Sequence, residues 1–266
     1  MDLELAGKVA IVTGGSRGIG KAVAQVLARE GAAVALIARD MQTANAAAEE
    51  ISPHSGRKLA AYRADTGDDA AVDSAVAQIA KDFGRIDILV NAAAQPGGQS
   101  RPPKLAEINN EQFWADMNVK VLGYLRCARA AAPHMARQNW GRIVNISGLA
   151  ARQTGSTIGS MRNVAVAALT KNLADELGPL GINVTCVHPG VTRTEKTPGV
   201  IRRQAEALGI TPEEVEKRWS GMNLIRRIVT SEEVADVVAF LASPRSVAVN
   251  GDAIAAGGGA PGAIYY

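Results

Sequence analysis

The sequence predicts a single α/β domain, in which a doubly wound parallel sheet of about seven strands carries helices on both faces. Three observations lead to this prediction. Short β-branched segments alternate with alanine-rich segments of helical period along all 266 residues. The strand segments, such as VAIV, AVALI and DILV, are almost continuously apolar, as strands covered on both faces must be. No repeat, linker or compositional break divides the chain, so residues 1–266 are expected to form one domain.

The elements follow one another as strand and helix, and right-handed crossovers place the strands in one sheet. The expected strands are Lys8–Thr13, Ala33–Ala38, Leu59–Arg63, Ile86–Asn91, Arg142–Ser147, Asn183–His188 and Ala253–Ala256. The expected helices include Gly18–Glu30, Asp69–Phe83, Gln112–Gln138, Ile158–Leu177 and Ser231–Leu241. The stretch at about 190–223 has an irregular pattern and is expected to be a lid over the site.

Composition excludes several classes of protein. A hydrophobic fraction of 47% excludes disorder, and a net charge of +3 spread along the chain disfavours nucleic acid or a membrane surface as partner. Two cysteines are too few for a disulfide framework or a thiolate metal site, so no metal is expected. The charged start MDLELAGKV is unlike a signal peptide, and no apolar run is long enough to span a membrane. We therefore expect a soluble cytoplasmic protein.

A glycine-rich loop joins the first expected strand to the first helix. It reads Thr13-Gly14-Gly15-Ser16-Arg17-Gly18-Ile19-Gly20. Gly14 permits a sharp turn, Gly18 permits close approach of a pyrophosphate, and Gly20 permits close helix packing. Free N–H groups at the helix start attract phosphate. A glycine turn can also serve packing alone, but its place between strand and helix favours dinucleotide binding in a Rossmann fold.

Other segments match the same kind of protein in the same order. They are Asp65 after the third strand, Asn91-Ala92-Ala93-Ala94 after the fourth, Asn118, Ser147, and Pro189-Gly190 with Thr192 and Thr194. With the G-x-x-x-G-x-G spacing, this pattern resembles the short-chain dehydrogenase/reductase family from about Leu5 to Gly259. The resemblance implies a nicotinamide-dependent oxidoreductase with a small-molecule substrate. It also implies a homodimer or homotetramer formed through the helices holding Asn118 and Ser160. It implies cofactor contacts from Gly14, Ser16, Arg17, Gly18, Ile19, Gly20, Arg39, Asp65, Asn91, Ala92, Pro189, Gly190, Thr192 and Thr194.

The residues near the end of the second strand bear on the choice of cofactor. An NAD enzyme places an acid there to bind the ribose, but this chain has Ala38 followed by Arg39. Arg39 and Arg17 can bind a 2′-phosphate through charge-assisted hydrogen bonds. Asp40 lies one or two residues late for the ribose, and Arg39 could also be a solvated surface cation. The sequence predicts NADP(H) in preference to NAD(H).

The catalytic pair of the family is missing. The family uses Tyr-x-x-x-Lys after the fifth strand, and this alignment puts Gly159 at the tyrosine position and Asn163 at the lysine position. The only tyrosines are Tyr62, Tyr124, Tyr265 and Tyr266, and none has a lysine four residues later. Ser147 and Asn118 match the family serine and asparagine. We therefore expect a catalytic set of Ser147, Asn118 and Asn163 around a vacant position at Gly159, with carbonyl reduction by the family route impaired.

Several other side chains could replace the missing acid. His188 is expected to be a packed structural histidine rather than a catalyst, and Lys120 is expected on another face of its helix from Asn118. Arg152 and Arg162 could polarise a carbonyl or simply be solvated, whereas Ser160 and Thr157 lack an activating base. The predicted function is an NADP(H)-binding oxidoreductase with a non-standard proton route. Two alternatives stay open: a non-redox dehydratase, isomerase or lyase, and an inactive cofactor-sensing protein.

Overall fold

The predicted parallel sheet is confirmed by the computed structural model, which describes residues 1–54, 56–95 and 102–264, so that Tyr265 and Tyr266 lie outside it. The seven strands are ordered β3-β2-β1-β4-β5-β6-β9, and every neighbouring pair is parallel. They are β1 (Val9–Thr13), β2 (Ala33–Ala38), β3 (Leu59–Arg63), β4 (Ile88–Asn91), β5 (Gly141–Ile146), β6 (Ile182–Pro189) and β9 (Ala253–Ala256). The direction in which strands are added reverses between β1 and β4, which is where such sheets bind ligands.

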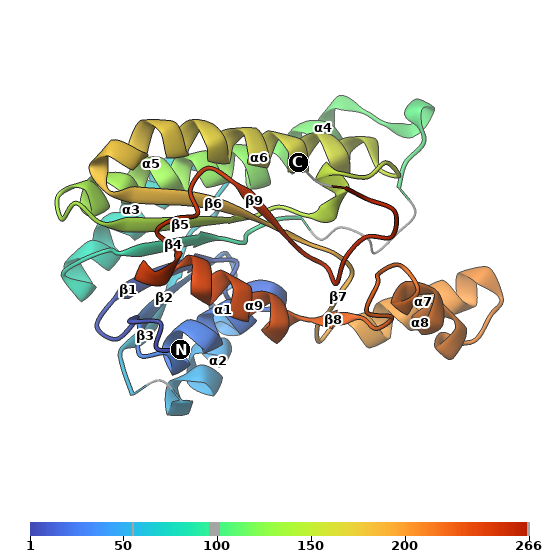
Figure 1. Ribbon diagram of the computed structural model, residues 1–266, viewed down its shortest axis with the longest axis horizontal. Helices are drawn as coiled ribbons and strands as arrows, with labels where there is room; N and C mark the ends of the chain where they lie inside the picture. The colour runs from blue at the N-terminus through green and yellow to red at the C-terminus, as the bar shows by residue number, and fades with distance from the viewer. Residues whose placement is uncertain (55, 96–101, 265–266) are drawn as a thin grey trace.

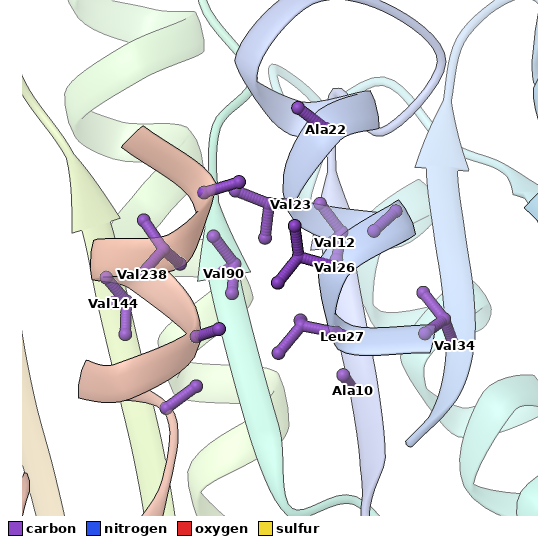
Figure 2. Close-up of a cluster of buried hydrophobic side chains, with 14 of the residues drawn as sticks. Ala10, Val12, Ala22, Val23, Val26, Leu27, Val34, Val90, Val144 and Val238 are labelled. Atoms are coloured by element: carbon purple, nitrogen blue, oxygen red, sulfur yellow. The ribbon is translucent and has the colours of Figure 1, made fainter. Parts of the chain in front are cut away.

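Helices cover both faces of the sheet (Figure 1). One face carries α1 (Gly18–Arg29), α2 (Met41–Ile51) and α9 (Ser231–Leu241), and the other carries α3 (Asp69–Phe83), α5 (Gly123–Ala136) and α6 (Thr157–Leu177). Figure 2 shows Val23, Val26 and Leu27 of α1 packing with Val238 of α9 over the sheet. Because both faces are buried, β1 and β4 have no exposed side chain, and each is apolar up to the polar residue that ends it, Thr13 or Asn91.

Local sequence fixes where most of these helices begin. The carboxylate of Asp68 accepts from Ala71 N at the start of α3, and the Ser156 hydroxyl accepts from Gly159 N at the start of α6. Thr230 and Glu233 form a capping box on α9. In contrast, Arg17 makes no side-chain cap on α1. The first N–H groups of α1 therefore receive no hydrogen-bond acceptor from the side chain of their own N-cap residue.

The expected helix at 112–138 is divided into three parts. A π-helical turn, Asn118–Leu122, separates α4 (Asn110–Met117) from α5. Turns of this kind are rare and occur frequently at functional sites.

The expected irregular stretch at 190–223 is mostly helical. It contains β7 (Thr192–Arg193), α7 (Thr197–Leu208) and α8 (Pro212–Ser220), and β7 pairs with β8 (Val229–Thr230). The helices α7 and α8 pack on each other through Ile201, Ala205 and Val215 and project away from the sheet (Figure 1). Short 3-10 turns cover Ser52–His54, Leu105–Glu107, Leu149–Ala151, Gly178–Leu180 and Pro244–Ser246. Within the described ranges, no helix is both long and apolar enough to cross a bilayer.

Candidate active site

The residues expected to form the site lie along one edge of the sheet. Because the seven strands are parallel, their carboxyl ends meet at that edge. The glycine loop follows β1, Arg39 follows β2, and Asp65 follows β3. Asn91 and Ala92 stand at the end of β4, Ser147 at the end of β5, and Pro189 and Gly190 at the end of β6.

The glycine loop has no room for side chains at two positions. Gly14 has a φ of +66°, and a Cβ there would lie 3.0 Å from Ala93 backbone atoms. A Cβ on Gly20 would lie 2.3 Å from the Gly14 carbonyl oxygen. The Thr13 hydroxyl accepts hydrogen bonds from the N–H groups of Ala92 and Ala93, at 3.1 and 3.2 Å. The loop and the end of β4 are thus held together at the point where the strand order reverses.

A carboxylate occupies the start of α1. The N–H of Gly18 donates to both carboxylate oxygens of Glu195, each at 3.2 Å. A cavity of about 310 Å³ opens here between α1, the segment Thr194–Glu195 and the start of α9. The contact demonstrates that this helix terminus accepts an anionic group, as its dipole and free N–H groups require.

The end of β2 carries one exposed cation. The Arg39 side chain is 56% exposed, and its Nη1 lies 3.9 Å from Asp65 Oδ2. Asp40 caps α2 by accepting from Gln42 N at 2.9 Å. The Asp40 carboxylate is therefore engaged by the backbone of the following helix. Asp65 also accepts from the N–H of Gly67 at 2.8 Å, which shapes the loop after β3.

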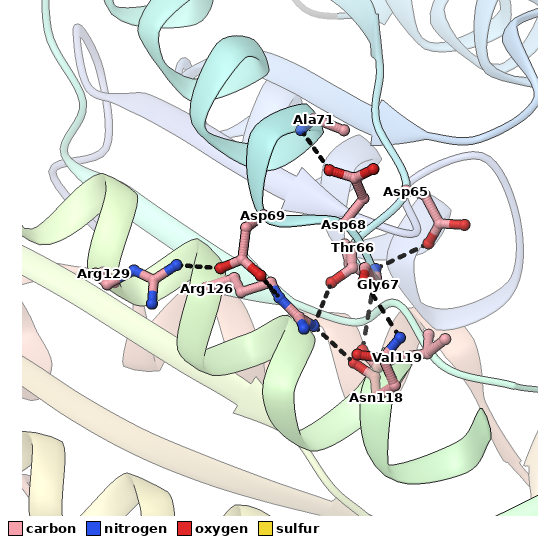
Figure 3. A network of polar contacts seen from close by, with 10 residues as sticks. All are labelled: Asp65, Thr66, Gly67, Asp68, Asp69, Ala71, Asn118, Val119, Arg126 and Arg129. Atoms are coloured by element: carbon pink, nitrogen blue, oxygen red, sulfur yellow. Dashed lines mark hydrogen bonds and ion pairs between the residues drawn. The ribbon is translucent and has the colours of Figure 1, made fainter. Parts of the chain in front are cut away.

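Asn118 is directed toward that loop. Its side-chain amide donates to Gly67 O at 3.2 Å, and its backbone carbonyl accepts from Arg126 at 3.1 Å (Figure 3). Arg126 also binds Asp69 of α3, at 2.8 Å. These contacts place the Asn118 side chain against the β3–α3 loop, outside the cluster formed by Ser147 and Asn163.

The expectation that Lys120 lies on another helix face from Asn118 is confirmed, and that face is directed at Ser147 and Asn163. Its Nζ donates to Asn163 Oδ1 at 2.8 Å and to the Ser147 carbonyl at 2.9 Å, and the side chain is buried. Lys120 lies inside the π-turn Asn118–Leu122, so the local geometry of that turn sets the direction of its side chain.

Burial strongly affects this amine. Desolvation, assisted by the nearby charge of Arg162, lowers the pKa of Lys120 from 10.5 to about 7. Lys120 thus changes its charge near neutral pH inside the site.

Replacing Lys120 by Met is expected to flatten the pH dependence of stability. Between pH 7 and 10.5 the unfolded chain binds more protons than the folded one, so the wild type gains stability as pH rises, by up to about 1.4 kcal/mol per unit. Below pH 7 both states are protonated and this contribution stays constant. The urea midpoints of the two proteins, measured from pH 7 to pH 9, give the difference between their slopes. The buried thiols of Cys127 and Cys186 are present in both proteins, so their titration cancels in the comparison. Equal slopes would contradict a buried amine.

The Ser147 hydroxyl is engaged by the protein. It donates to the Asn163 carbonyl at 2.9 Å and lies 3.3 Å from Asn163 Oδ1. A Cβ built on Gly148 would lie 3.2 Å from Asn163 Nδ2, so the amide nitrogen faces Gly148. A Cβ built on Gly159 would meet Ser156 alone, with Oγ the nearest atom at 2.7 Å. A phenol at position 159 therefore requires Ser156 to rotate.

The Asn91 side chain lies beneath this edge rather than in it. It is fully buried and donates to Asn145 Oδ1 at 2.9 Å, and Asn145 donates to the Thr170 hydroxyl at 3.0 Å. In this arrangement a cofactor could meet the backbone around Asn91 and Ala92 but not the Asn91 amide.

Three other side chains that could replace the missing acid are each held by contacts within the protein. His188 is buried, lies 3.8 Å from Cys186 Sγ, and has its pKa lowered to about 4 by burial and by the charges of Arg152 and Lys120. It is therefore neutral at pH 7, in agreement with a structural histidine. Arg162 is buried and paired with Asp116 at 2.6 Å, and Arg152 donates to Ala253 O, so neither is simply solvated.

Sequence reasoning missed two of the residues that shape the site. Lys120 carried no local signal, because the sequence does not reveal that the π-turn holding it faces Asn163 of α6. Glu195 lies 177 residues from Gly18, and only the tertiary fold brings them together. Thr192 and Thr194, which were expected to contact the cofactor, lie in the segment after β6. The Thr192 hydroxyl donates to Gly190 O, and the N–H of Thr194 donates to the Thr197 hydroxyl.

The fold and this edge define a dinucleotide-binding domain of the Rossmann type, with a glycine loop at the point where the strand order reverses. A family model described as enoyl-(acyl carrier protein) reductase matches residues 14–260. The chain belongs to the short-chain dehydrogenase/reductase family, which is a family of oxidoreductases.

Relatives match over almost the whole chain. The short-chain reductase protein NovJ of Streptomyces niveus is 37% identical, and the alignment covers 95% of this chain and 94% of NovJ. L-sorbose reductase of Gluconobacter frateurii, solved with NADPH and L-sorbose, superposes with a TM-score of 0.93 at 27% identity, covering 99% and 100% of the two chains. An NAD⁺-bound xylitol dehydrogenase gives a TM-score of 0.87 at 28% identity, covering 96% and 100%. Similar structures therefore include both NADPH and NAD⁺ complexes.

Proposed function

We propose that this protein is an NADP(H)-dependent oxidoreductase of small molecules whose proton route does not use the family tyrosine. The observation that carries the cofactor preference is the end of β2, where Ala38 leaves no carboxylate for a ribose and Arg39 offers an exposed guanidinium. Arg17 in the glycine loop adds a second cation. The engagement of Asp40 as a helix cap supports the same preference.

The residues along the sheet edge fit a dinucleotide. The N–H groups at the start of α1 would receive the diphosphate, and the backbone of Ala92 and Ala93 would line the crevice beside Gly14. When bound, the nicotinamide supplies or accepts a hydride. The segment 190–223 would close over the substrate, with Thr192 and Thr194 near its base.

The non-standard proton route follows from three side chains. Gly159 supplies no acid, the Ser147 hydroxyl donates to the Asn163 carbonyl, and His188 has a pKa of about 4. We infer that a reduced carbonyl oxygen takes its proton from water rather than from a phenol. Reduction should then be slow with generic ketones and should accelerate as the concentration of a small buffer acid is raised.

Thermal unfolding with each nucleotide tests the cofactor assignment. At 100 times its dissociation constant, a ligand that binds only the folded state adds about 2.7 kcal/mol of stability. NADPH should raise the Tm at lower concentration than NADH. The absence of a shift with either nucleotide would remove the proposed function, whereas binding without turnover on a carbonyl and alcohol panel would favour a non-redox or sensing role.

Replacing Glu195 by Gln is expected to tighten NADPH binding about two- to fivefold, because the diphosphate must displace the Glu195 carboxylate from Gly18 N. A titration of both proteins at one salt concentration measures the change. Glu206→Gln on the exposed side of α7 removes the same charge elsewhere and should leave affinity unaltered. Weaker binding in Glu195→Gln would mean that Glu195 assists the cofactor instead.

We also propose that the chain assembles as a homodimer or homotetramer through α4, α5 and α6. Apolar side chains exposed on these helices and the π-turn support this, namely Trp114, Leu122, Leu125, Met161 and Val164. Light scattering should give at least twice the 27.7 kDa mass of one chain. A mass of one chain at micromolar concentration would contradict the assembly.

A further inference from the structure

A buried amine connects the π-turn to α6 beneath the candidate active site. Lys120 is 5% exposed, and its Nζ reaches Asn163 Oδ1 and the Ser147 carbonyl. Burying an amine costs free energy unless its hydrogen bonds are satisfied, so both acceptors matter to the fold. The contact with Asn163 indicates what Lys120 does.

The contact fixes which end of the Asn163 amide faces the site. A lysine can donate hydrogen bonds but, when charged, cannot accept them, so it selects the oxygen of the amide. With Oδ1 held by Lys120, Nδ2 is turned to the Gly148 side, where a Cβ at 148 would come within 3.2 Å. Nδ2 has no hydrogen-bond partner among the described residues. An unused donor therefore lies beside Gly148, just after the carboxyl end of β5, where a side chain at position 148 would crowd it.

We propose that Lys120 is a positioning residue that holds the Asn163 amide so that Nδ2 donates to an oxygen atom in the nicotinamide half of bound NADP(H). This rests on the cofactor proposed above. Without Lys120, a half-turn of the Asn163 amide would present Oδ1 instead, which repels a ligand oxygen that has no proton to offer. Lys120 acts through Asn163 and does not itself contact the cofactor.

Two ligands separate this role from a merely structural one. NADPH contains the nicotinamide half, whereas 2′,5′-ADP contains only the adenosine half with its phosphates. Lys120→Met and Asn163→Ala should each weaken NADPH about three- to tenfold, the loss of one hydrogen bond, and should leave 2′,5′-ADP unchanged. The double variant should bind NADPH no more weakly than Asn163→Ala, because both changes remove the same contact.

Three further variants make the test robust. Lys120→Gln keeps an N–H donor for Asn163 Oδ1 and should recover part of the affinity. Asn163→Asp keeps a partner for Lys120, and so keeps the fold, but replaces the donor by an acceptor and should weaken NADPH at least as much as Asn163→Ala. Lys171→Met on the exposed face of α6 removes a lysine that pairs with Asp175, and should change nothing.

The outcomes are distinct. Additive losses in the double variant, equal losses for NADPH and 2′,5′-ADP, or wild-type NADPH affinity in Asn163→Asp would each overturn the positioning role. Failure of the wild type to bind either nicotinamide dinucleotide would instead overturn the proposed function.

Discussion

Replacing Asn163 by Lys is expected to destabilise the protein by at least about 3 kcal/mol, although this substitution restores the residue type that the family has there. The reason is Lys120, whose Nζ lies 2.8 Å from Asn163 Oδ1 in a buried pocket. A second amine would lose the hydrogen bond and place two like groups in a site that already lowers the pKa of one of them to about 7.

Lys120→Met in the Asn163→Lys background is expected to recover most of that loss, because one amine then remains in the pocket. Denaturant unfolding of the four proteins at pH 7 gives the coupling energy directly. Asn172→Lys is the matched control, since it makes the same substitution at an exposed position of α6. If Asn163→Lys is as stable as wild type, the two side chains do not share a pocket.

The same reasoning governs any attempt to rebuild the family's catalytic pair. Gly159→Tyr with Asn163→Lys should give a soluble reductase only when Lys120→Met is included. The phenol introduced at position 159 additionally displaces the Ser156 hydroxyl that caps α6, which costs about 1 kcal/mol. NADPH oxidation with simple ketones measures the gain in this triple variant, and no gain would mean that the nicotinamide is not placed beside position 159.

Replacing Arg39 by Ala is expected to weaken NADPH binding about 10- to 150-fold and to change NADH binding less than about twofold. A hydrogen bond from a guanidinium to a phosphate is worth about 1.5–3 kcal/mol, and NADH lacks the 2′-phosphate. The 3.9 Å approach of Arg39 to Asp65 is long and exposed, so its loss should cost little stability.

Isothermal titration with both nucleotides at one ionic strength measures this change. Arg29→Ala is a suitable control, because that side chain is 60% exposed, is similarly paired with a carboxylate, and lies at the far end of α1. Equal losses for NADPH and NADH would assign Arg39 to the general electrostatic attraction of phosphates rather than to cofactor choice.

Sequence patterns determined the sheet because its physical requirements are local. A strand covered on both faces is an apolar run, and β2 begins and ends at the predicted residues. The edge strands β3 and β9 and the helices α3 and α9 also match their predicted bounds. The glycine loop was equally readable, since a positive φ at Gly14 and the lack of space at Gly20 can be met only by glycine.

The tertiary structure alone decided the interior of the site. Sequence spacing assumed a regular helix from 112 to 138, whereas Lys120 lies in a π-turn at Asn118–Leu122 and contacts Asn163. The substitution of Gly159 and Asn163 for the family pair was plain from the sequence, but what fills the space was not. A hydrogen bond between residues 43 positions apart depends on how two helices pack on the sheet, and no local pattern encodes that distance.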